Sequence, residues 1–270
     1  MIFLFLLTFP YKCCIILPSS KERSCNMVKL IVSDVDGTLL PYGAITPSKS
    51  VIDAISSVLQ KGVKFAIASG RSYEDLVNLF PELKDKVYFI AHDGALTVKD
   101  GVRLFHQAMP QETLRRVVNL YSNINGCIAL YSMDKCYCIG KKNDFVKSNN
   151  VIQIKNLFEV RDQIYKIGIY GAQKPIKDDI LGTRLCSLSE GCIEYVSSLA
   201  QKGTALSDLQ MRLFMNKFDT AAVGNYYNDV KMLKNAKYSA AMASSPEDVR
   251  ASAMYVTDNA EEFIVKCIEL

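Results

Sequence analysis

Short apolar segments alternate with helical ones in the first and last thirds of this 270-residue chain. The first of them are VKLIVS from Val28, VKFAIA from Val63 and VYFIA from Val87, and helical patterns at 47–60 and 73–80 lie between them. Strands that alternate with helices predict right-handed βαβ units. Because these strands are apolar throughout, we predict an α/β fold in which helices cover both faces of a parallel sheet.

The pattern changes between residues 94 and 196. Two hairpin-like pairs, ALTV with VRLFHQ and CIALYS with KCYCIG, predict antiparallel sheet, and Lys99-Asp100-Gly101 is the first turn. The other elements expected here are helices at 111–121 and near 175–181 and the strands IYKIGIYG and GCIEYVS. The parallel pattern returns after Gln201, with helices expected at 204–215, 229–234 and 260–268. We therefore predict a core of residues 27–93 and 197–270, with an inserted α+β domain of residues 94–196.

The bulk composition excludes some partners. Hydrophobic residues make up 49% of the chain, enough to bury a sizeable core. The formal net charge is only +4, and the basic residues are scattered among acidic ones, so we expect no nucleic-acid partner. Nine cysteines, an odd number without CxxC spacing, favour reduced thiols and a cytoplasmic protein. Cys136 and Cys138 fit alternation on a strand better than metal ligation.

The first 26 residues are apolar, are interrupted by Pro10 and lack the positive start of a secretory signal. They are also too short and too broken to span a bilayer. A disordered extension, or translation from a start upstream of Met27, is the preferred interpretation. A weak membrane-associated leader remains the alternative, and no stable membrane partner is expected.

The strongest chemical signal is SDVDGTL at 33–39, directly after an apolar strand. Residues two apart at a strand end project the same way, so Asp34 and Asp36 can face one ligand beyond the sheet. Two close carboxylates repel each other unless a cation intervenes, and oxygen ligands of this kind favour Mg²⁺. One carboxylate can attack phosphorus while the other transfers a proton, and Gly37 permits a tight turn near the phosphoryl group. An acidic turn or part of a calcium loop is the alternative.

Two further segments lie where the parallel pattern meets a helix. In ASGR, Ser69 can donate to a phosphoryl oxygen beside the amides of a helix start, or it can merely cap that helix. Arg71 can equally be a surface ion-pair partner. In QKGTAL, Lys202 beside the attacking carboxylate would reduce the repulsion between nucleophile and phosphate, although most single lysines are solvated.

The fourth segment, VGNYYND at 223–229, follows another apolar strand. Asp229 and the Asn225 carbonyl can complete a metal shell or orient its waters. Alternatively, Asp229 is a helix start stabilised by the helix dipole. Because all four segments lie at the same end of predicted elements, a common site explains them better than four unrelated caps.

Together these segments resemble the haloacid-dehalogenase-like superfamily, and the large insert resembles its Cof-type phosphatase branch. The resemblance covers residue 27 to the carboxyl end and implies a Rossmann-like core with an inserted cap domain. It also implies that Asp34 is the nucleophile, that Asp36 is the general acid and base, and that Ser69 and Lys202 bind phosphate. Further phosphate- or substrate-binding residues are expected at Gly37, Thr38, Gly70, Arg71 and Asn228.

The chain departs from the family pattern at two places. The fourth motif of the family usually reads GDxxND, but Asn225 stands here in place of the first Asp and is a weaker magnesium ligand. Where the family often has NGA, this chain has His92-Asp93-Gly94-Ala95, which puts a substrate contact from Asp93 in doubt. His92 at the hinge between core and cap is expected to pack there, with a substrate contact as the alternative.

These observations favour a magnesium-dependent phosphatase of small phosphorylated metabolites, such as a sugar phosphate, a nucleotide or a phosphorylated cofactor, acting through an aspartyl-phosphate. The expected metal ligands are Asp34, Asp36, Asn225 and Asp229. The protein would be a monomer or homodimer. A sugar phosphomutase and a non-catalytic metabolite-binding regulator remain alternatives.

Overall fold

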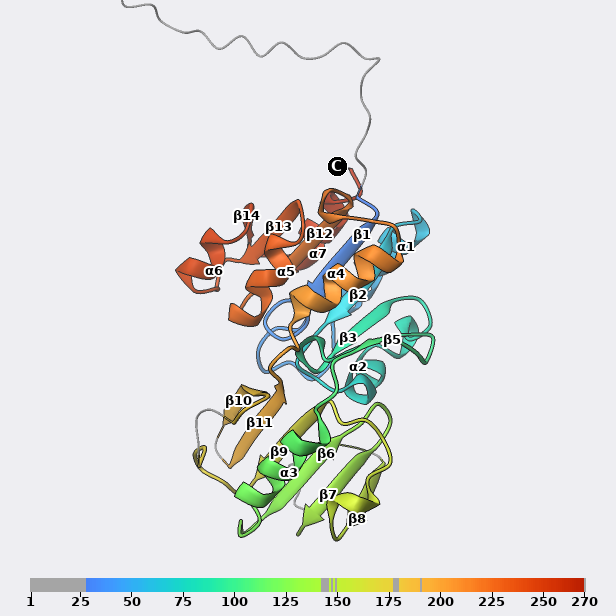
Figure 1. Ribbon diagram of the computed structural model, residues 1–270. Helices are drawn as coiled ribbons and strands as arrows, with labels where there is room; N and C mark the ends of the chain where they lie inside the picture. The colour runs from blue at the N-terminus through green and yellow to red at the C-terminus, as the bar shows by residue number, and fades with distance from the viewer. Residues whose placement is uncertain are drawn as a thin grey trace, which may run out of the picture.

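The computed structural model describes residues 28–141, 146, 148, 150–176, 180–189 and 191–269, so the predicted 1–26 extension lies outside the described residues. Two sheets form two domains that lie end to end, the core above and the cap below in Figure 1. The core contains both the first and the last described segments, and the cap is built from the middle of the chain.

The core sheet has eight strands in the order β14-β13-β12-β1-β2-β3-β4-β5. Pairing from β14 to β3 is parallel, and β4 and β5 are antiparallel. The strands are β1 Leu30–Asp34, β2 Lys64–Ala68, β3 Tyr88–Ala91, β4 Leu96–Lys99, β5 Val102–His106, β12 Thr220–Gly224, β13 Tyr238–Met242 and β14 Tyr255–Thr257. The helices of this domain are α1 Lys49–Gln60, α2 Tyr73–Leu79, α4 Lys202–Arg212, α5 Val230–Lys234, α6 Glu247–Ala251 and α7 Ala260–Lys266.

Strand β1 shows why helices cover both faces of this sheet. Successive side chains of a strand point to opposite faces. Ile31 packs in a buried cluster with α1, α2 and α7, whereas Leu30 and Val32 pack in a second cluster with α4, α5 and α6. Apolar side chains on both faces of one strand are the reason that it reads as a continuous apolar run, as the sequence predicted.

The hairpin β4–β5 belongs to the core sheet, and here the structure differs from the predicted domain limits. The expected insert began at residue 94, but β3 pairs with β4 and β4 with β5, so the first sheet continues to His106. A hairpin pattern reveals that two strands pair with each other, but it does not reveal which sheet they extend. The second sheet starts only after α3, Gln111–Leu120.

The cap sheet has six strands in the order β10-β11-β9-β6-β7-β8. They are β6 Cys127–Tyr131, β7 Cys136–Gly140, β8 Val151–Ile154, β9 Lys166–Tyr170, β10 Thr183–Ser189 and β11 Cys192–Ser197. One face is apolar and packs on α3 through side chains such as Leu130, Ile167 and Tyr195. The helix predicted near 175–181 falls partly on residues 177–179, outside the described residues.

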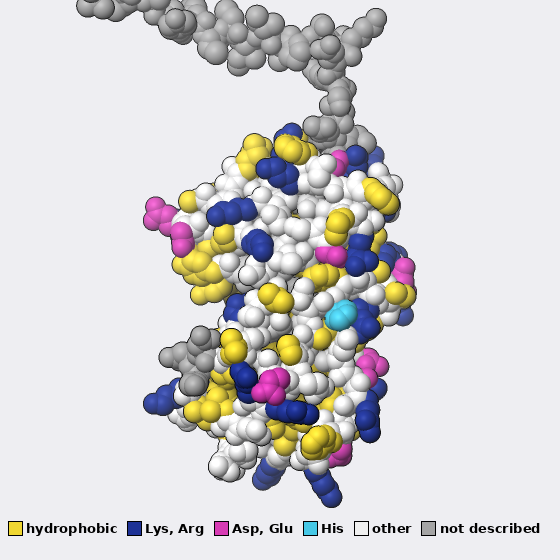
Figure 2. Space-filling view, in the orientation of Figure 1, with side chains coloured by type: hydrophobic (Ala, Val, Ile, Leu, Met, Phe, Trp, Pro, Cys, Tyr) yellow, Lys and Arg dark blue, Asp and Glu magenta, His cyan; other side chains and the backbone are white. Residues whose placement is uncertain are grey.

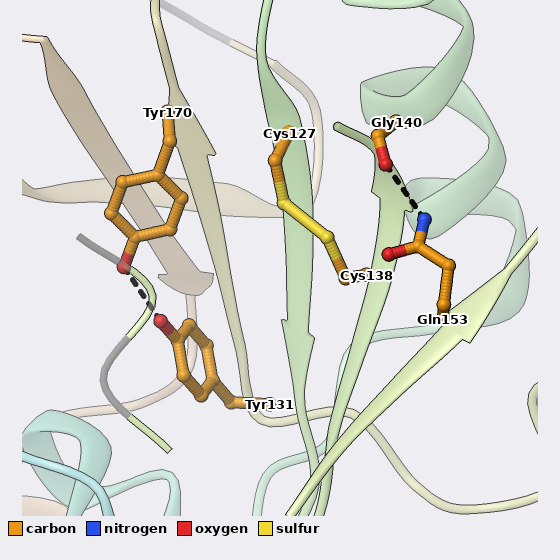
Figure 3. The surroundings of a disulfide bond; sticks show 6 residues. All are labelled: Cys127, Tyr131, Cys138, Gly140, Gln153 and Tyr170. Atoms are coloured by element: carbon orange, nitrogen blue, oxygen red, sulfur yellow. Dashed lines mark hydrogen bonds between the residues drawn. A yellow bond between two sulfur atoms is a disulfide. The ribbon is translucent and has the colours of Figure 1, made fainter. Parts of the chain in front are cut away.

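The opposite face of the cap sheet carries a disulfide between Cys127 and Cys138, which Figure 3 shows beside Tyr131 and Tyr170. The prediction of reduced thiols is therefore wrong for this pair. Both residues lie on this face of neighbouring strands, and their Cα atoms are 6.4 Å apart, within reach of a disulfide. Cys136 is buried in the same cluster, as strand alternation predicted.

Basic and acidic side chains are mixed on the molecular surface. On the face shown in Figure 2, Lys and Arg side chains are spread over both domains with acidic side chains between them, and they form no stripe. Within the described ranges, no helix is both long enough and apolar enough to cross a membrane.

The turn between β3 and β4 packs tightly on the start of α4 at Gly94, whose φ is +92°. A Cβ atom at this position would lie 2.3 Å from the Gln201 carbonyl oxygen and 2.7 Å from the Lys202 nitrogen. The exit from β3 is therefore packed directly against the start of α4. A side chain at residue 94 would push on the segment that carries Lys202.

We predict that Gly94→Ala destabilises the protein far more than Gly62→Ala does. Both glycines have positive φ, but a Cβ at Gly62 would meet nothing within 4 Å. Gly62→Ala should therefore cost only the left-handed backbone penalty of about 1–2 kcal/mol, and Gly94→Ala should cost about 1–3 kcal/mol more from overpacking. Urea unfolding followed by circular dichroism measures both, and equal costs would contradict the tight packing at Gly94.

Candidate active site

The carboxyl ends of the parallel strands open onto a cavity of about 620 Å³ between core and cap. Strands β1, β2, β3 and β12 run parallel, so the residues that follow them meet at one edge of the sheet. The predicted site residues that line this cavity are Asp34, Asp36, Ser69, Gly70, Arg71, Asn225 and Asn228. The others, Gly37, Thr38, Lys202 and Asp229, contact members of this set.

Lys202 ties two strand ends together at the floor of the site. Its Nζ donates to Asp34 Oδ1 at 2.5 Å and to Asp229 Oδ1 at 2.8 Å. The side chain is only 1% exposed, so these ion pairs are shielded from water. Burial alone would lower the pKa of Lys202, but the negative charges of Asp229 and Asp34 outweigh it and raise the pKa. Lys202 is therefore a permanent buried cation.

Asp34 lies in an environment with too little positive charge. Burial raises its pKa to about 7, and the negative charge of Asp229 adds to this, while Lys202 acts in the opposite direction. The second oxygen, Oδ2, accepts a hydrogen bond of 3.1 Å from the Thr38 hydroxyl. One lysine thus does not fully compensate two buried carboxylates. An additional cation at this place would favour the ionised form of Asp34.

Asp229 is held by its own turn. Its Oδ2 accepts the backbone amides of Asn225 at 2.9 Å and of Tyr226 at 3.1 Å, and its Oδ1 accepts Lys202. Both carboxylate oxygens are therefore engaged, and Asp229 orients Lys202 and the Asn225 loop. The Asn225 side chain donates from Nδ2 to the Tyr42 hydroxyl at 2.8 Å, which leaves its amide oxygen without a hydrogen bond from the described residues.

Asp36 and Arg71 form a pair at the mouth of the cavity. Arg71 Nη2 lies 2.6 Å from Asp36 Oδ1, and Arg71 Nε lies 3.0 Å from Oδ2. Both side chains are more than a third exposed. Arg71 thus grips the carboxylate predicted to act as acid and base, with the two-point geometry typical of guanidinium and carboxylate groups. Its predicted contact with phosphate remains a prediction.

The turn after β1 and the turn after β2 shape the core side of the cavity. Gly37 has φ +81°, and a Cβ there would lie 2.1 Å from Asn225 Nδ2, so only glycine fits. Its amide donates to the Leu40 carbonyl. Ser69 is buried, and its Oγ accepts the Arg71 amide at 3.2 Å. The N-cap of α2 is Ser72, so capping of that helix does not account for Ser69.

Asp93 joins the turn after β3 to the site. Its Oδ1 accepts a hydrogen bond of 2.8 Å from Asn228 Nδ2, and its carboxylate lies beside Gly70. His92 precedes it with φ +51°, is fully buried and stacks on Tyr165 at 6.1 Å between ring centroids. His92 thus packs against Tyr165, which precedes β9 of the cap, although it also borders the cavity.

The cap side of the cavity was not predicted from the sequence. It is formed by the disulfide-bearing face of the cap sheet, through Tyr131, Lys166, Tyr170, Cys186, Ser187, Ser189, Cys192 and Glu194. Several of these alternate with the apolar side chains that face α3, such as Ile167 and Ile193. Alternating polar and apolar residues do indicate a strand with one apolar and one polar face. The sequence does not show, however, whether the polar face meets a cavity or bulk water.

The ligand atoms at this edge of the sheet are of the type that a hard divalent cation prefers. They are oxygens from Asp34, Asp36 and the Asn225 amide, which suit Mg²⁺. The pKa of Asp34 is raised by burial and then by the negative charge of Asp229. Within the part of the chain that the structure describes, no three Asp, Glu, His or Cys side chains form a ready cluster. Asp36 is turned to Arg71, and residue 225 is an amide.

Comparison with known proteins agrees with this geometry. The chain is 24% identical to a 5-amino-6-(5-phospho-D-ribitylamino)uracil phosphatase of Escherichia coli, over 84% of this chain and 90% of that protein. It is also 24% identical to phosphoglycolate phosphatase 1 of Saccharolobus solfataricus, over 90% of this chain and 97% of that protein. A solved phosphatase of the haloalkanoate superfamily from Bacteroides thetaiotaomicron matches with a TM-score of 0.74 and 25% identity, over 94% of this chain and 99% of that one.

The family model for haloacid dehalogenase-like hydrolases matches residues 31–265, which include both parts of the core sheet and the whole cap. The solved relative shares the arrangement of the fold over almost its full length. This chain therefore belongs to the haloacid dehalogenase-like hydrolases.

Proposed function

We propose that this enzyme hydrolyses small phosphorylated metabolites with the help of Mg²⁺ and through an aspartyl-phosphate on Asp34. The observation that carries the proposal is the buried bridge from Lys202 to Asp34 and Asp229 at the floor of the cavity. It holds one carboxylate at the carboxyl end of β1, where it borders the cavity, beside a permanent positive charge. Such a charge lowers the repulsion between an anionic nucleophile and an anionic phosphate.

The reaction consists of two displacements at phosphorus, and different residues act in each. Asp34 attacks phosphorus and the alcohol leaves, with a proton from Asp36; water then attacks the aspartyl-phosphate, with Asp36 as the base. The Thr38 hydroxyl donates to Asp34 Oδ2 and fixes the orientation of the carboxylate. The Ser69 hydroxyl, which borders the cavity, donates to the phosphoryl group.

In this mechanism Arg71 must move from the position that it has in the structure. It is bound to Asp36 in the structure, and Asp36 must be able to protonate a leaving oxygen. We propose that the incoming phosphate draws Arg71 away from Asp36, because a guanidinium binds phosphate and carboxylate with the same two-point geometry.

When bound, Mg²⁺ would neutralise charge on the transferring phosphoryl group. Asp34, Asp36 and the Asn225 amide oxygen would hold it, while Asp229 supports Lys202 and the loop. A phosphomutase would use the same residues and differ only in the acceptor of the phosphoryl group. The relatives that are named for hydrolysis favour release to water.

We predict that Asp34→Asn lowers phosphatase activity at least roughly a thousandfold, because an amide cannot form the aspartyl-phosphate. Release of inorganic phosphate from 4-nitrophenyl phosphate in the presence of Mg²⁺ measures it. The control is Asp208→Asn, which removes an exposed ion pair with Arg212 on α4 and should leave the rate unchanged. Similar rates for Asp34→Asn and wild type would remove Asp34 from the mechanism.

The raised pKa of Asp34 also predicts a pH-dependent stability. Between its unfolded value of 3.8 and its folded value of about 7, the unfolded chain has lost the proton that the folded protein keeps, so stability falls as pH rises. With EDTA present, wild type should lose up to about 1.4 kcal/mol per pH unit relative to Asp34→Asn in this window. Urea unfolding at several pH values tests this, and parallel stability curves would contradict it.

We predict that Asn225→Asp tightens magnesium binding by about tenfold, because a carboxylate replaces a neutral amide oxygen. The Tyr42 hydroxyl, now accepting from Asn225 Nδ2, can donate to the new carboxylate instead. Thermal melting against Mg²⁺ concentration measures the change, with Tyr42→Phe as the control for this hydrogen bond. A weaker or unchanged Mg²⁺ response of Asn225→Asp would exclude residue 225 from the metal shell.

A further inference from the structure

The cap wall of the cavity contains a buried ion pair that the chemistry at Asp34 does not use. Lys166 of β9 and Glu194 of β11 lie on the cavity face of the cap sheet, and Lys166 Nζ is 2.9 Å from Glu194 Oε2. The Lys166 side chain is 8% exposed and that of Glu194 is 20% exposed. Burial alone would lower the pKa of Lys166, but Glu194 outweighs it and raises the pKa. Lys166 therefore remains charged.

Lys166 has unused hydrogen-bonding capacity. An ammonium group carries three N–H donors, and among the described residues only Glu194 accepts one from Lys166. Buried donors without partners are costly, and these lie in the wall of a cavity large enough for a substrate. The pair presents donors on Lys166 next to an acceptor on Glu194. Hydroxyl groups, which both donate and accept, match such a surface.

On the same face, next to this pair, the hydroxyls of Tyr131 and Tyr170 form a hydrogen bond of 2.6 Å, which Figure 3 shows. Each hydroxyl carries one proton, so the bond between them leaves one proton to donate elsewhere. Ser187 and Ser189 of β10 border the cavity as well. The cap wall around the pair is thus polar and uncharged.

The charges around the cavity are unfavourable for a second anion. Five carboxylates border it, from Asp34, Asp36, Asp75, Asp93 and Glu194, and the bordering cations are Arg71 and Lys166. Each of these cations is already paired with a carboxylate, Arg71 with Asp36 and Lys166 with Glu194. At the Asp34 end of the cavity, Lys202 lies beneath the described wall and supplies a positive charge. At the cap end, the described wall has no positive charge that is not already paired with a carboxylate.

We propose that Lys166 and Glu194 determine specificity, and that they select phosphate monoesters whose leaving group is an uncharged polyol over esters whose leaving group carries a carboxylate. The inference rests on the proposed function, because it assumes that the phosphoryl group lies at Asp34. Lys166 donates to substrate hydroxyls and Glu194 accepts from them. Glu194 also repels a carboxylate and cancels the charge that would otherwise attract one.

The test compares matched substrates that differ only in this group. Sorbitol 6-phosphate and 6-phosphogluconate form a long pair, and glycerol 3-phosphate and 3-phosphoglycerate form a short pair. Within at least one pair, wild type should show a kcat/KM at least about tenfold higher for the polyol phosphate. This ratio needs no variant. A ratio near one, or a preference for the carboxylate in both pairs, would overturn the inference.

Glu194→Gln should reduce that preference about tenfold or more, because the variant removes the repelling carboxylate and leaves Lys166 free to attract an anion. The matched control is Glu112→Gln, which breaks an exposed ion pair with Arg116 on α3, on the other face of the cap sheet. It should leave the ratio unchanged. Thermal melting confirms that each variant is folded, and an unchanged ratio in folded Glu194→Gln would overturn the role of the pair.

The same assays separate the two proposals. If wild type releases no phosphate from 4-nitrophenyl phosphate or from any of the four esters, the proposed function fails and the inference fails with it. If wild type hydrolyses 4-nitrophenyl phosphate in a reaction that requires Asp34 but does not prefer the polyol esters, the proposed function stands and only the inference fails.

Discussion

The site depends on one buried lysine. Lys202 begins α4 at the point where the chain returns from the cap, and it is in contact with carboxylates that follow β1 and β12. Two carboxylates this deeply buried would repel each other and would be costly to desolvate without a cation between them. The lysine therefore joins three distant parts of the sequence. Burial and the negative charge of Asp229 still raise the pKa of Asp34, and under the proposed function a divalent cation would favour its ionised form.

The cap closes the site with a sheet whose two faces differ. One face is apolar and packs on α3, which stabilises the cap through burial. The other presents tyrosines, serines and the Lys166–Glu194 pair to the cavity. Because side chains alternate along each strand, packing on one face leaves the other free to vary with the substrate. Under the proposed function, the core supplies the chemistry and the cap selects the substrate.

Much of the fold could be predicted because parallel strands buried on both faces leave a clear apolar signal, and Ser33 to Leu39 mark the end of the first. The strands β8 and β10 were missed since both are partly exposed and lack an apolar run. The contacts between particular side chains could not be predicted from the sequence either. Nothing in the motif spacing indicates that Arg71 turns to Asp36, that Cys127 bonds to Cys138, or that Glu194 meets Lys166. Such contacts depend on register and rotamer, which only the folded chain specifies.

The central claim is that Asp34 becomes phosphorylated during turnover. The most direct measurement is to quench the enzyme during the reaction with a good substrate, reduce it with borohydride, which converts an acyl phosphate to an alcohol, and locate the modified residue by peptide mass spectrometry. The account predicts homoserine at position 34, absent without substrate and absent in Asp34→Asn. Homoserine at another acidic residue, or unmodified Asp34 under conditions of rapid turnover, would contradict it.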